Sequence, residues 1–308
     1  MGKVAFIFPG QGAQKIGMGQ DFYENSQLAK ETYQGASELL DLSMENLCFK
    51  KNDEINVTEY TQAAILTTSM AMFREIEARG YKFDVTAGLS LGEYSALVAA
   101  RVMTFDEAVA VVRQRGILMQ QSVPRGEGSM AAVLGMSGEA VDNVVDTIHG
   151  VDIANYNCPG QVVISGETQA VDEACQALKE AGAKRTLGLN VSGPFHSRML
   201  RDAGEKLSEV LADVKINNPQ VPYVTNVTAE YVSNKKEIKN LLQTQVYSAV
   251  RWEQSVQMMM ADGVDTFVEI GPGKTLTAFV KKISADAKVY NVEKWEDLDG
   301  LAEFLKRD

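Results

Sequence analysis

Cysteine and histidine are both scarce in this chain of 308 residues. The cysteines are Cys48, Cys158 and Cys175, widely spaced and without a C-x-x-C pair. An odd number at such spacing argues against a disulfide framework and against a zinc site. We therefore expect no metal and a reducing, cytoplasmic setting. The only histidines are His149 and His196, so an imidazole base has two candidates.

Long apolar runs and a positive net charge are missing as well. No stretch approaches the roughly 18 apolar residues that a membrane span needs. The apolar run at residues 4–8 ends at Pro9-Gly10 and so resembles a first strand rather than a signal peptide. A net charge of -11 disfavours nonspecific binding to nucleic acid. We expect neither a membrane nor a nucleic acid as a partner.

The first part of the chain alternates strands and helices. Val4–Phe8 and Asp84–Gly88 have the apolar character of buried strands, and Thr61–Arg79 and Glu93–Val102 have the apolar spacing of helices. With 45% hydrophobic residues, the chain can bury a sizeable core. The alternation favours an α/β fold with a parallel sheet.

The middle of the chain has a different order of predicted elements. Strands are expected at Ser129–Leu134, Val151–Asn155, Gln161–Ser165 and Lys184–Val191. Helices are expected at Gly138–Ile148 and Ala170–Ala181. The order βαββαβ is typical of a ferredoxin-like unit. A Pro- and Gly-containing linker at 124–128 and an exit at Gly193-Pro194 delimit it. We therefore expect an inserted subdomain at 124–197 and a larger domain made of 1–123 and 198–308.

The last part returns to an alternating pattern. A helix is expected at Met199–Val210, a strand at Pro222–Val227, mostly helix at Asn234–Met260, then strand, helix, strand and helix at Thr266–Ile270, Lys274–Ile283, Lys288–Val292 and Leu298–Leu305.

The segment GLSLG at 88–92 matches G-x-S-x-G between a predicted strand and a predicted helix. This is the context of a nucleophile elbow, which makes Ser90 the candidate nucleophile. The N–H of Leu91 can point at a developing oxyanion near the positive end of the helix. FPGQG at 8–12 ends the first strand and can add a second N–H at Gln11. The alternative is a Gly-rich turn with an incidental serine.

A serine nucleophile needs a base. His149 stands at the end of a predicted helix, where the helix dipole favours it without any catalysis. His196 lies in GPFHS at 193–197, in a loop that Gly and Pro constrain. His196 is therefore the candidate base, with a surface-loop histidine as the alternative. No Asp or Glu stands out as the acid of a triad.

No nucleotide-binding loop fits the glycine-rich segments. A dinucleotide motif starting at Gly10 would need glycine at position 15, where Lys15 stands, and a phosphate loop ending at Lys274 would need glycine at Val268. No cofactor is expected.

Together the motifs resemble the malonyl-CoA:acyl carrier protein transacylases of bacterial type II fatty-acid synthesis. The resemblance covers essentially the whole chain. It rests on FPGQGAQ (8–14), GLSLGEYSALVAA (88–100), RQRG (113–116), QVVISG (161–166), NVSGPFHS (190–197), TNVTA (225–229) and EIGPGKTL (269–276). It implies an α/β-hydrolase-like core with a parallel sheet and an inserted ferredoxin-like subdomain, in agreement with the pattern above.

The resemblance also implies a reaction. A malonyl group would pass from malonyl-CoA to the pantetheine thiol of acyl carrier protein by a ping-pong route through an ester on Ser90. His196 would be the base, and the N–H groups of Gln11 and Leu91 would hold the oxyanion. Arg115 would pair with the malonyl carboxylate. Taken alone, this arginine is expected to be a solvated charge, because exposed arginine is the norm.

Two further positions come from the resemblance. Gln245 would orient the histidine through its backbone carbonyl, which would account for the missing acid. Leu89 occupies a place where the family often has histidine. That histidine is not the base, so the chemistry should survive, but a polar contact beside the site is lost and the fine substrate preference is open.

Three other functions remain open at this point. A thioesterase or another serine hydrolase would use the same serine and histidine, and would not hold a malonyl-enzyme until a thiol is added. A non-catalytic module that binds acyl carrier protein would fail to label Ser90. A transacylase of a polyketide or other multifunctional system is the third, although the chain ends close to the predicted domain limits and so looks freestanding.

Docking of an acidic carrier protein on this acidic chain would need a local basic face. Lys184 with Arg185, or Arg198 with Arg201, are the candidates, and a solvated surface is the alternative for each pair.

The two histidines can be told apart by mutation. We predict that His196→Ala lowers the rate of acyl transfer by orders of magnitude, because general-base catalysis contributes about 10²–10⁴-fold. His149→Ala should hardly change it. The activity measured against pH should show one ionisation near neutrality. An inactive His149→Ala protein beside an active His196→Ala protein would reverse the assignment.

Overall fold

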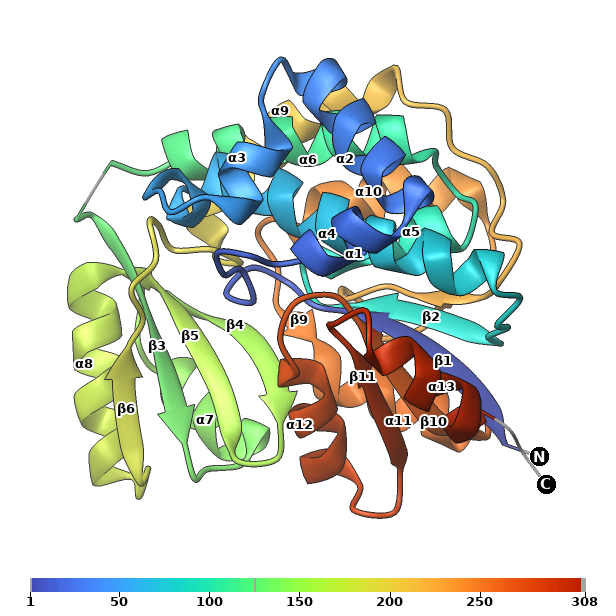
Figure 1. Ribbon diagram of the computed structural model, residues 1–308. Coiled ribbons are helices and arrows are strands. Elements are labelled where there is room, and N and C mark those ends of the chain that lie inside the picture. Colours follow the sequence, from blue (N-terminus) through green and yellow to red (C-terminus); the bar gives the residue numbers. More distant parts are fainter. Residues whose placement is uncertain (1, 125, 306–308) are drawn as a thin grey trace.

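A computed structural model describes residues 2–124 and 126–305. The strands of this part are β1 (Lys3–Phe8), β2 (Val85–Gly88), β3 (Gly128–Leu134), β4 (Val151–Cys158), β5 (Gln161–Glu167), β6 (Arg185–Gly188), β7 (Tyr223–Val224), β8 (Tyr231–Val232), β9 (Val250–Arg251), β10 (Val264–Ile270) and β11 (Lys288–Val292). They form two sheets that lie side by side (Figure 1).

Helices cover both sheets. They are α1 (Gln20–Asn25), α2 (Gln27–Leu40), α3 (Met44–Phe49), α4 (Thr58–Ala78), α5 (Gly92–Ala99), α6 (Phe105–Gln121), α7 (Gly138–Val145), α8 (Thr168–Glu180), α9 (Arg201–Ala212), α10 (Lys235–Gln245), α11 (Trp252–Ala261), α12 (Thr275–Ile283) and α13 (Asp297–Leu305), with 3-10 turns η1 (Glu54–Asn56) and η2 (Arg198–Leu200). Within the described ranges, none of these helices has the length and apolar character to cross a membrane.

The larger sheet has six strands in the order β11-β10-β1-β2-β7-β8, parallel except for the antiparallel edge strand β8. Its central strand β1 is buried on both faces. Phe6 and Phe8 pack with α4, α5 and α6, whereas Ala5 and Ile7 pack with α11 and α12. A parallel strand covered by helices on both sides must be apolar at successive positions, as KVAFIF is.

The parallel strands bring the two glycine-rich segments together. β1 and β2 pair in register up to Phe8 and Gly88, so both strands end at the same edge of the sheet. The segments FPGQG and GLSLG therefore leave the sheet side by side. Ligands of open α/β sheets bind at this carboxyl edge.

The smaller sheet has five strands in the order β6-β3-β5-β4-β9. Helices α7 and α8 pack on one of its faces through a separate apolar cluster. Its last strand, β9, comes from residues 250–251, outside the range 124–197, and runs parallel to β4. The division of the chain at 124 and 197 stays a prediction, and Arg125 of the expected linker lies outside the described residues.

Most of the predicted elements are present with shifted ends, and two predictions are wrong in part. The range 234–260 contains two helices, α10 and α11, separated by β9. Pairing of Val250 with Asn155 of β4 prevails over helical spacing there. The helix predicted to reach Ile148 ends at Val145, before a turn in which Gly150 has φ 88°. Helices α1 to α3 were not predicted.

Glu269 is a buried carboxyl at the end of β10. It is 0% exposed and accepts the N–H groups of Leu276 (3.1 Å) and Thr277 (2.7 Å) at the start of α12. Burial raises the pKa of Glu269 to about 7, although both hydrogen bonds oppose this.

The raised pKa of Glu269 predicts a dependence of stability on pH. Between about pH 4.5 and 7 the native carboxyl keeps a proton that the unfolded one has lost, so the free energy of unfolding falls as pH rises. Glu269→Gln cannot ionise. Between pH 5 and pH 7, the unfolding free energy of this variant should fall by about 2 kcal/mol less than that of the wild type. Urea denaturation of both proteins at both pH values measures this, and equal pH dependence would show that Glu269 is already ionised at pH 5.

Candidate active site

Ser90 lies on a strained turn between β2 and α5. Its φ is 52°, in the left-handed region that costs a residue with a side chain about 1–3 kcal/mol. The turn is closely packed. A Cβ on Gly88 would lie 2.0 Å from the backbone of Gly92, and one on Gly92 would lie 2.1 Å from the carbonyl oxygen of Phe8. Only glycine fits both positions, which explains the spacing G-x-S-x-G.

Asn226, in the loop between β7 and β8, holds this turn. Its Oδ1 accepts the N–H of Ser90 (2.6 Å) and its Nδ2 donates to the carbonyl oxygen of Gly88 (2.7 Å). Its own N–H donates to Glu93 Oε2 (3.0 Å). Asn226 belongs to the TNVTA segment, but nothing in the sequence indicated that it supports the turn at Ser90.

Ser90, His196 and Gln245 form a chain of hydrogen bonds. Ser90 Oγ is 2.8 Å from His196 Nε2, and His196 Nδ1 is 2.8 Å from the backbone oxygen of Gln245. Because a carbonyl oxygen only accepts, Nδ1 carries the hydrogen and Nε2 is free to accept from the serine hydroxyl. This geometry allows an imidazole to take the proton of an attacking serine.

His196 is held neutral. Burial, with the charge of Arg115 as a second cause, lowers the pKa of His196 to about 4. The imidazole can therefore accept a proton throughout the physiological range. The ionisation near neutrality expected from the sequence does not belong to His196 in the free protein. His149 is exposed in the turn after α7, which ends earlier than predicted.

Arg115 of α6 is buried rather than solvated, with 1% exposure. Its guanidinium donates to Gln62 Oε1 (2.8 Å), Gln245 Oε1 (3.0 Å) and Ser90 Oγ (3.2 Å). Within residues 2–124 and 126–305 it makes no salt bridge. The next residue, Gly116, lets α6 approach α4, since a Cβ there would lie 2.7 Å from Glu59 Cα. This close helix contact buries the arginine.

Arg113 points elsewhere, as the helical spacing predicts. Its guanidinium pairs with Glu59 (2.8 Å) and lies over the ring of Tyr60 at 4.4 Å. It is therefore a suitable control for Arg115.

Glu93, in the first turn of α5, is a buried carboxyl that sequence analysis missed. Its Oε2 accepts from Gln245 Nε2 (2.6 Å) as well as from Asn226. Burial raises the pKa of Glu93 to about 7, and the hydrogen bonds and Arg115 oppose this. An acidic residue in the first turn of a helix is ordinary, because it suits the helix dipole, so the sequence gave no signal.

The candidate oxyanion donors lie in adjoining loops. A Cβ on Gly10 would lie 2.4 Å from the carbonyl oxygen of Leu89, so the two loops touch. Leu91 is buried and Gln11 half-buried, and no described residue accepts a hydrogen bond from either backbone N–H. The two groups are free to bind an oxygen of a ligand. The Leu89 side chain packs against the apolar cluster of α11 and α12.

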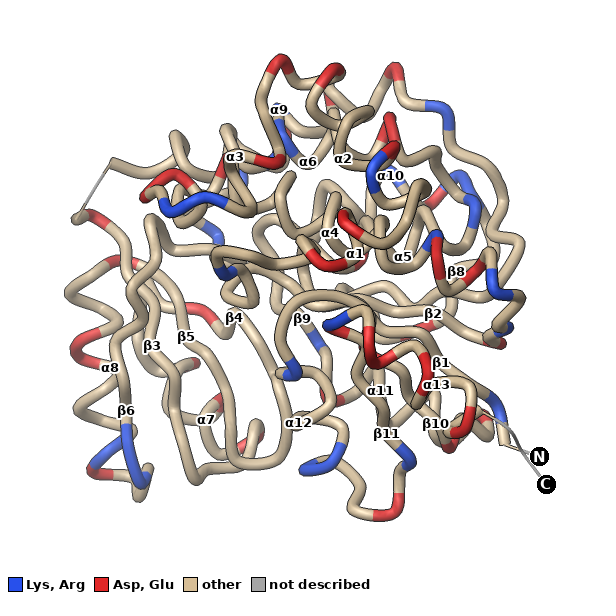
Figure 2. Tube along the Cα trace, in the orientation of Figure 1, with Lys and Arg blue, Asp and Glu red and all other residues tan. Residues whose placement is uncertain are grey.

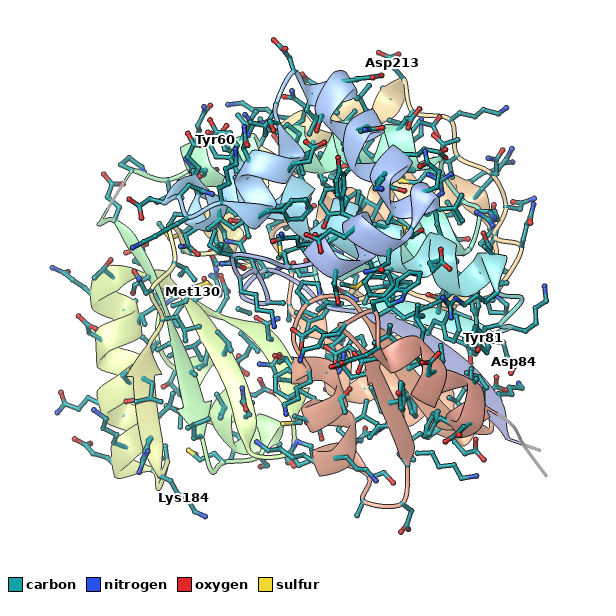
Figure 3. The ribbon with its side chains drawn as sticks, in the orientation of Figure 1. Tyr60, Tyr81, Asp84, Met130, Lys184 and Asp213 are labelled. Carbon is teal, nitrogen blue, oxygen red and sulfur yellow. The ribbon has the colours of Figure 1, made fainter. Side chains whose placement is uncertain are left out.

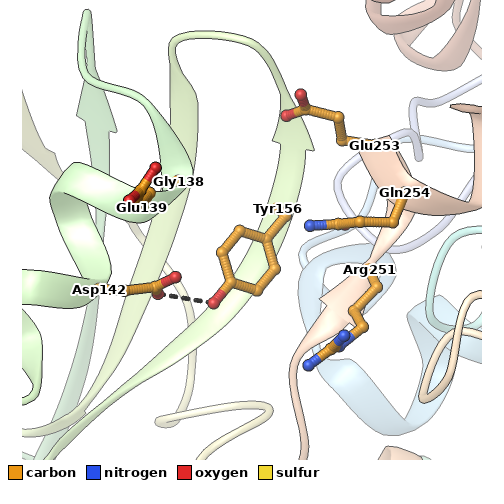
Figure 4. A pocket seen from close by; sticks show the side chains of 7 residues that line it. All are labelled: Gly138, Glu139, Asp142, Tyr156, Arg251, Glu253 and Gln254. Carbon is orange, nitrogen blue, oxygen red and sulfur yellow. Dashed lines mark hydrogen bonds between the residues drawn. The ribbon is translucent and has the colours of Figure 1, made fainter.

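A polar cavity of about 290 Å³ lies elsewhere, between the smaller sheet and α11 (Figure 4). Tyr156 of β4 lines it and donates to Asp142 Oδ1 at 2.6 Å. None of the predicted site residues lines this cavity, so it is separate from the cluster around Ser90.

The candidate docking pairs differ in their position. Figure 3 places Lys184 and Met130 at opposite ends of the smaller sheet, and Leu189, on the way to His196, donates to the Met130 carbonyl (2.9 Å). Lys184 and Arg185 thus lie at the end away from His196. Arg198 pairs with Asp152, and Arg201 lies over the ring of Tyr247 at 5.1 Å. Figure 2 shows acidic and basic residues interspersed over the rest of the trace.

Known proteins match the chain along its whole length. A family described as acyl transferase domain matches residues 5–296. The malonyl CoA-acyl carrier protein transacylase of Bacillus subtilis (strain 168) is 46% identical over 313 residues, covering 100% of this chain and 99% of that protein.

Solved structures agree. A malonyl CoA-acyl carrier protein transacylase from Clostridium perfringens has a TM-score of 0.96 at 43% identity, covering 99% of this chain and 97% of the other. A malonyl-transacylase in complex with its type II PKS acyl-carrier protein has a TM-score of 0.95 at 38% identity, covering 98% and 99%.

The parallel sheet, the buried serine and histidine and these matches define the protein as an acyltransferase. Within that class, the chain belongs to the malonyl-CoA:acyl carrier protein transacylase family, which confirms the resemblance seen in the sequence.

Proposed function

We propose that this chain transfers a malonyl group from malonyl-CoA to the pantetheine thiol of acyl carrier protein, for fatty-acid synthesis, through an ester on Ser90. The observation that carries the proposal is the environment of Arg115. In the described structure this buried guanidinium donates to neutral oxygens, makes no salt bridge and lies 3.2 Å from Ser90 Oγ. The Glu93 carboxylate acts on it only from the far side of the Gln245 amide, and a buried charge without a direct ionic partner is costly. A substrate carboxylate near the attacked carbonyl would be such a direct partner, and malonyl has one.

In the first half-reaction, Ser90 Oγ attacks the thioester carbonyl of malonyl-CoA while His196 Nε2 takes its proton. The negative charge on the tetrahedral oxygen is held by the N–H groups of Gln11 and Leu91. Loss of one such donor typically costs about 3 to 4 kcal/mol. The C–S bond then breaks, His196 returns the proton to the sulfur, and coenzyme A leaves. The backbone oxygen of Gln245 keeps His196 in the required tautomer throughout.

In the second half-reaction, the pantetheine thiol attacks the ester carbonyl and His196 takes the thiol proton. The C–O bond of the ester breaks and the proton returns to Ser90. A relative in complex with its acyl-carrier protein supports this partner. Transfer to water is avoided if the malonyl carboxylate fills the space beside Arg115 and excludes water there.

The two sheets support a finer description of the fold. We interpret the larger sheet as an α/β-hydrolase-like core, because Ser90 follows a parallel strand on a left-handed turn. We interpret residues 124–197 as a ferredoxin-like insert, because β3 to β6 adopt the order β6-β3-β5-β4 with α7 and α8 on one face.

The covalent step can be tested by mass spectrometry of the intact protein after brief mixing with malonyl-CoA. One malonyl adduct should form on Ser90 and persist until a thiol acceptor is added. Ser90→Ala should keep the fold and form no adduct. An adduct that decays in water as fast as in the presence of thiol would identify a hydrolase, and a wild-type adduct on Ser90→Ala would remove Ser90 from the reaction.

The role of Arg115 predicts a change in substrate choice. Loss of one partner of a desolvated ion pair costs about 2–5 kcal/mol. Arg115→Ala should therefore lower kcat/KM for malonyl-CoA by about 30- to 4,000-fold. Acetyl-CoA lacks the carboxylate, so its kcat/KM should stay the same or rise.

The matched control is Arg113→Ala, because Arg113 pairs with Glu59 outside the site. The measurement is the malonyl-to-acetyl ratio of kcat/KM in both variants. An equal loss for both substrates in Arg115→Ala would make the arginine structural. A changed ratio in Arg113→Ala alone would mean that the wrong arginine was chosen.

A further inference from the structure

Arg115 and Glu93 are joined by one side-chain amide. Gln245 Oε1 accepts from Arg115 (3.0 Å), and Gln245 Nε2 donates to Glu93 Oε2 (2.6 Å). A guanidinium has only donors and a carboxylate only acceptors, so the amide can face them in one orientation. The two charged groups are therefore held in fixed positions beside Ser90.

The free site is close to electrical balance. Arg115 faces Glu93 from α6, Tyr94 lies next to it on α5, and Tyr223 faces it from β7. Burial raises the pKa of both tyrosines, so they stay neutral, and the lowered pKa keeps His196 neutral. One cation and one anion remain. A malonyl carboxylate at Arg115 would add a second anion to a buried cluster.

We propose that Glu93 takes up one proton when the malonyl group enters the site and releases it when the group leaves on the carrier protein. This inference rests on the proposed function. The proton comes from a hydronium ion or a buffer acid, whose O–H bond breaks as an O–H bond forms on the Glu93 carboxylate. No group is oxidised or reduced, and the buried cluster has the same net charge before and after loading.

The carboxyl of Glu93 has a place for this proton. Both of its hydrogen bonds are made by Oε2, whereas Oε1 is buried and has no partner among the described residues. The buried hydroxyl of Thr225, which also lacks a partner within hydrogen-bond distance there, is a neighbouring donor that lowers the pKa of Glu93. A hydroxyl can also accept, so it can turn toward a proton on Oε1. A proton on Oε1 therefore leaves the bonds from Asn226 and Gln245 intact, and the Ser90 turn stays in place.

The pKa of Glu93 supports this role. At about 7 it already exceeds that of an ordinary glutamate, because the carboxyl is buried. A second anion nearby raises the pKa of a carboxyl further. The free protein at pH 8 is then mostly ionised at Glu93 and the malonyl form mostly protonated. At pH 6 both forms are protonated, and loading should move no proton.

The test is a count of protons during a single loading. The full-length protein is mixed with malonyl-CoA or acetyl-CoA in weak buffer with a pH indicator, and intact mass gives the amount of acyl-Ser90. Both substrates release coenzyme A, whose thiol ionises to the same extent in each case. The quantity measured is therefore the number of protons taken up with malonyl-CoA minus the number taken up with acetyl-CoA. We expect malonyl loading to take up about 0.5 to 1 proton more than acetyl loading at pH 8, and about 0.1 or less at pH 6.

Two variants identify the group. Glu93→Gln should abolish the difference between the substrates at pH 8. Glu269→Gln is the matched control and should keep the difference. Glu269 is also fully buried, and burial raises its pKa to about 7, but it is bonded to the start of α12 and not to the site residues. The malonyl-enzyme fraction at equilibrium should fall by up to about tenfold per pH unit above 7 in the wild type and in Glu269→Gln, and should not fall in Glu93→Gln.

The outcomes separate this inference from the proposed function. A malonyl-Ser90 adduct that forms with the proton count of acetyl loading would overturn the role of Glu93 and leave the transfer intact. A difference that survives in Glu93→Gln would also overturn it. Failure to form malonyl-Ser90 would overturn both. If Glu93→Gln does not fold, the proton counts of the wild type with malonyl-CoA and acetyl-CoA still decide whether a proton is taken up on malonyl loading.

Discussion

The position of one glutamine determines how the site is put together. Gln245 ends α10, and its backbone oxygen accepts from His196 Nδ1 (2.8 Å). Its side chain lies between Arg115 and Glu93, and its Nε2 also donates to the Ser90 carbonyl oxygen (3.1 Å). The positions of four side chains thus depend on one residue that is 0% exposed: His196, Arg115, Glu93 and Ser90. Hydrogen bonds in a buried network of this kind strengthen one another, because the surroundings screen them less than water does.

Ser90 and His196 could be predicted from the sequence because local signals indicate them. A G-x-S-x-G segment between a strand and a helix identifies the serine, and the chain contains only one other histidine. Arg115 and Gln245 were expected only through the family resemblance. Residue types alone favoured a solvated Arg115, and its burial follows from the contact of α4 and α6 at Gly116.

Glu93 and Asn226 were found by neither route. Their importance depends on hydrogen bonds between residues more than 130 positions apart in the chain, such as the bond from the Asn226 N–H to Glu93 Oε2. Sequence spacing carries no record of such contacts. The strand at Val250–Arg251 was missed for a related reason, because it exists only through its pairing with β4.

That short strand links the smaller sheet to the turn that carries Ser90. Arg251 lies opposite Tyr156 of β4 in the pairing, and its N–H donates to the carbonyl oxygen of Asn226 (3.0 Å), the residue that holds the Ser90 turn. Figure 4 shows the side chains of Arg251 and Tyr156 next to each other in the lining of the polar cavity. A rotation of the smaller sheet that displaced β9 would also displace Asn226, because the two are joined by this hydrogen bond. The position of the smaller sheet and the alignment of Ser90 are therefore coupled through two hydrogen bonds of one asparagine.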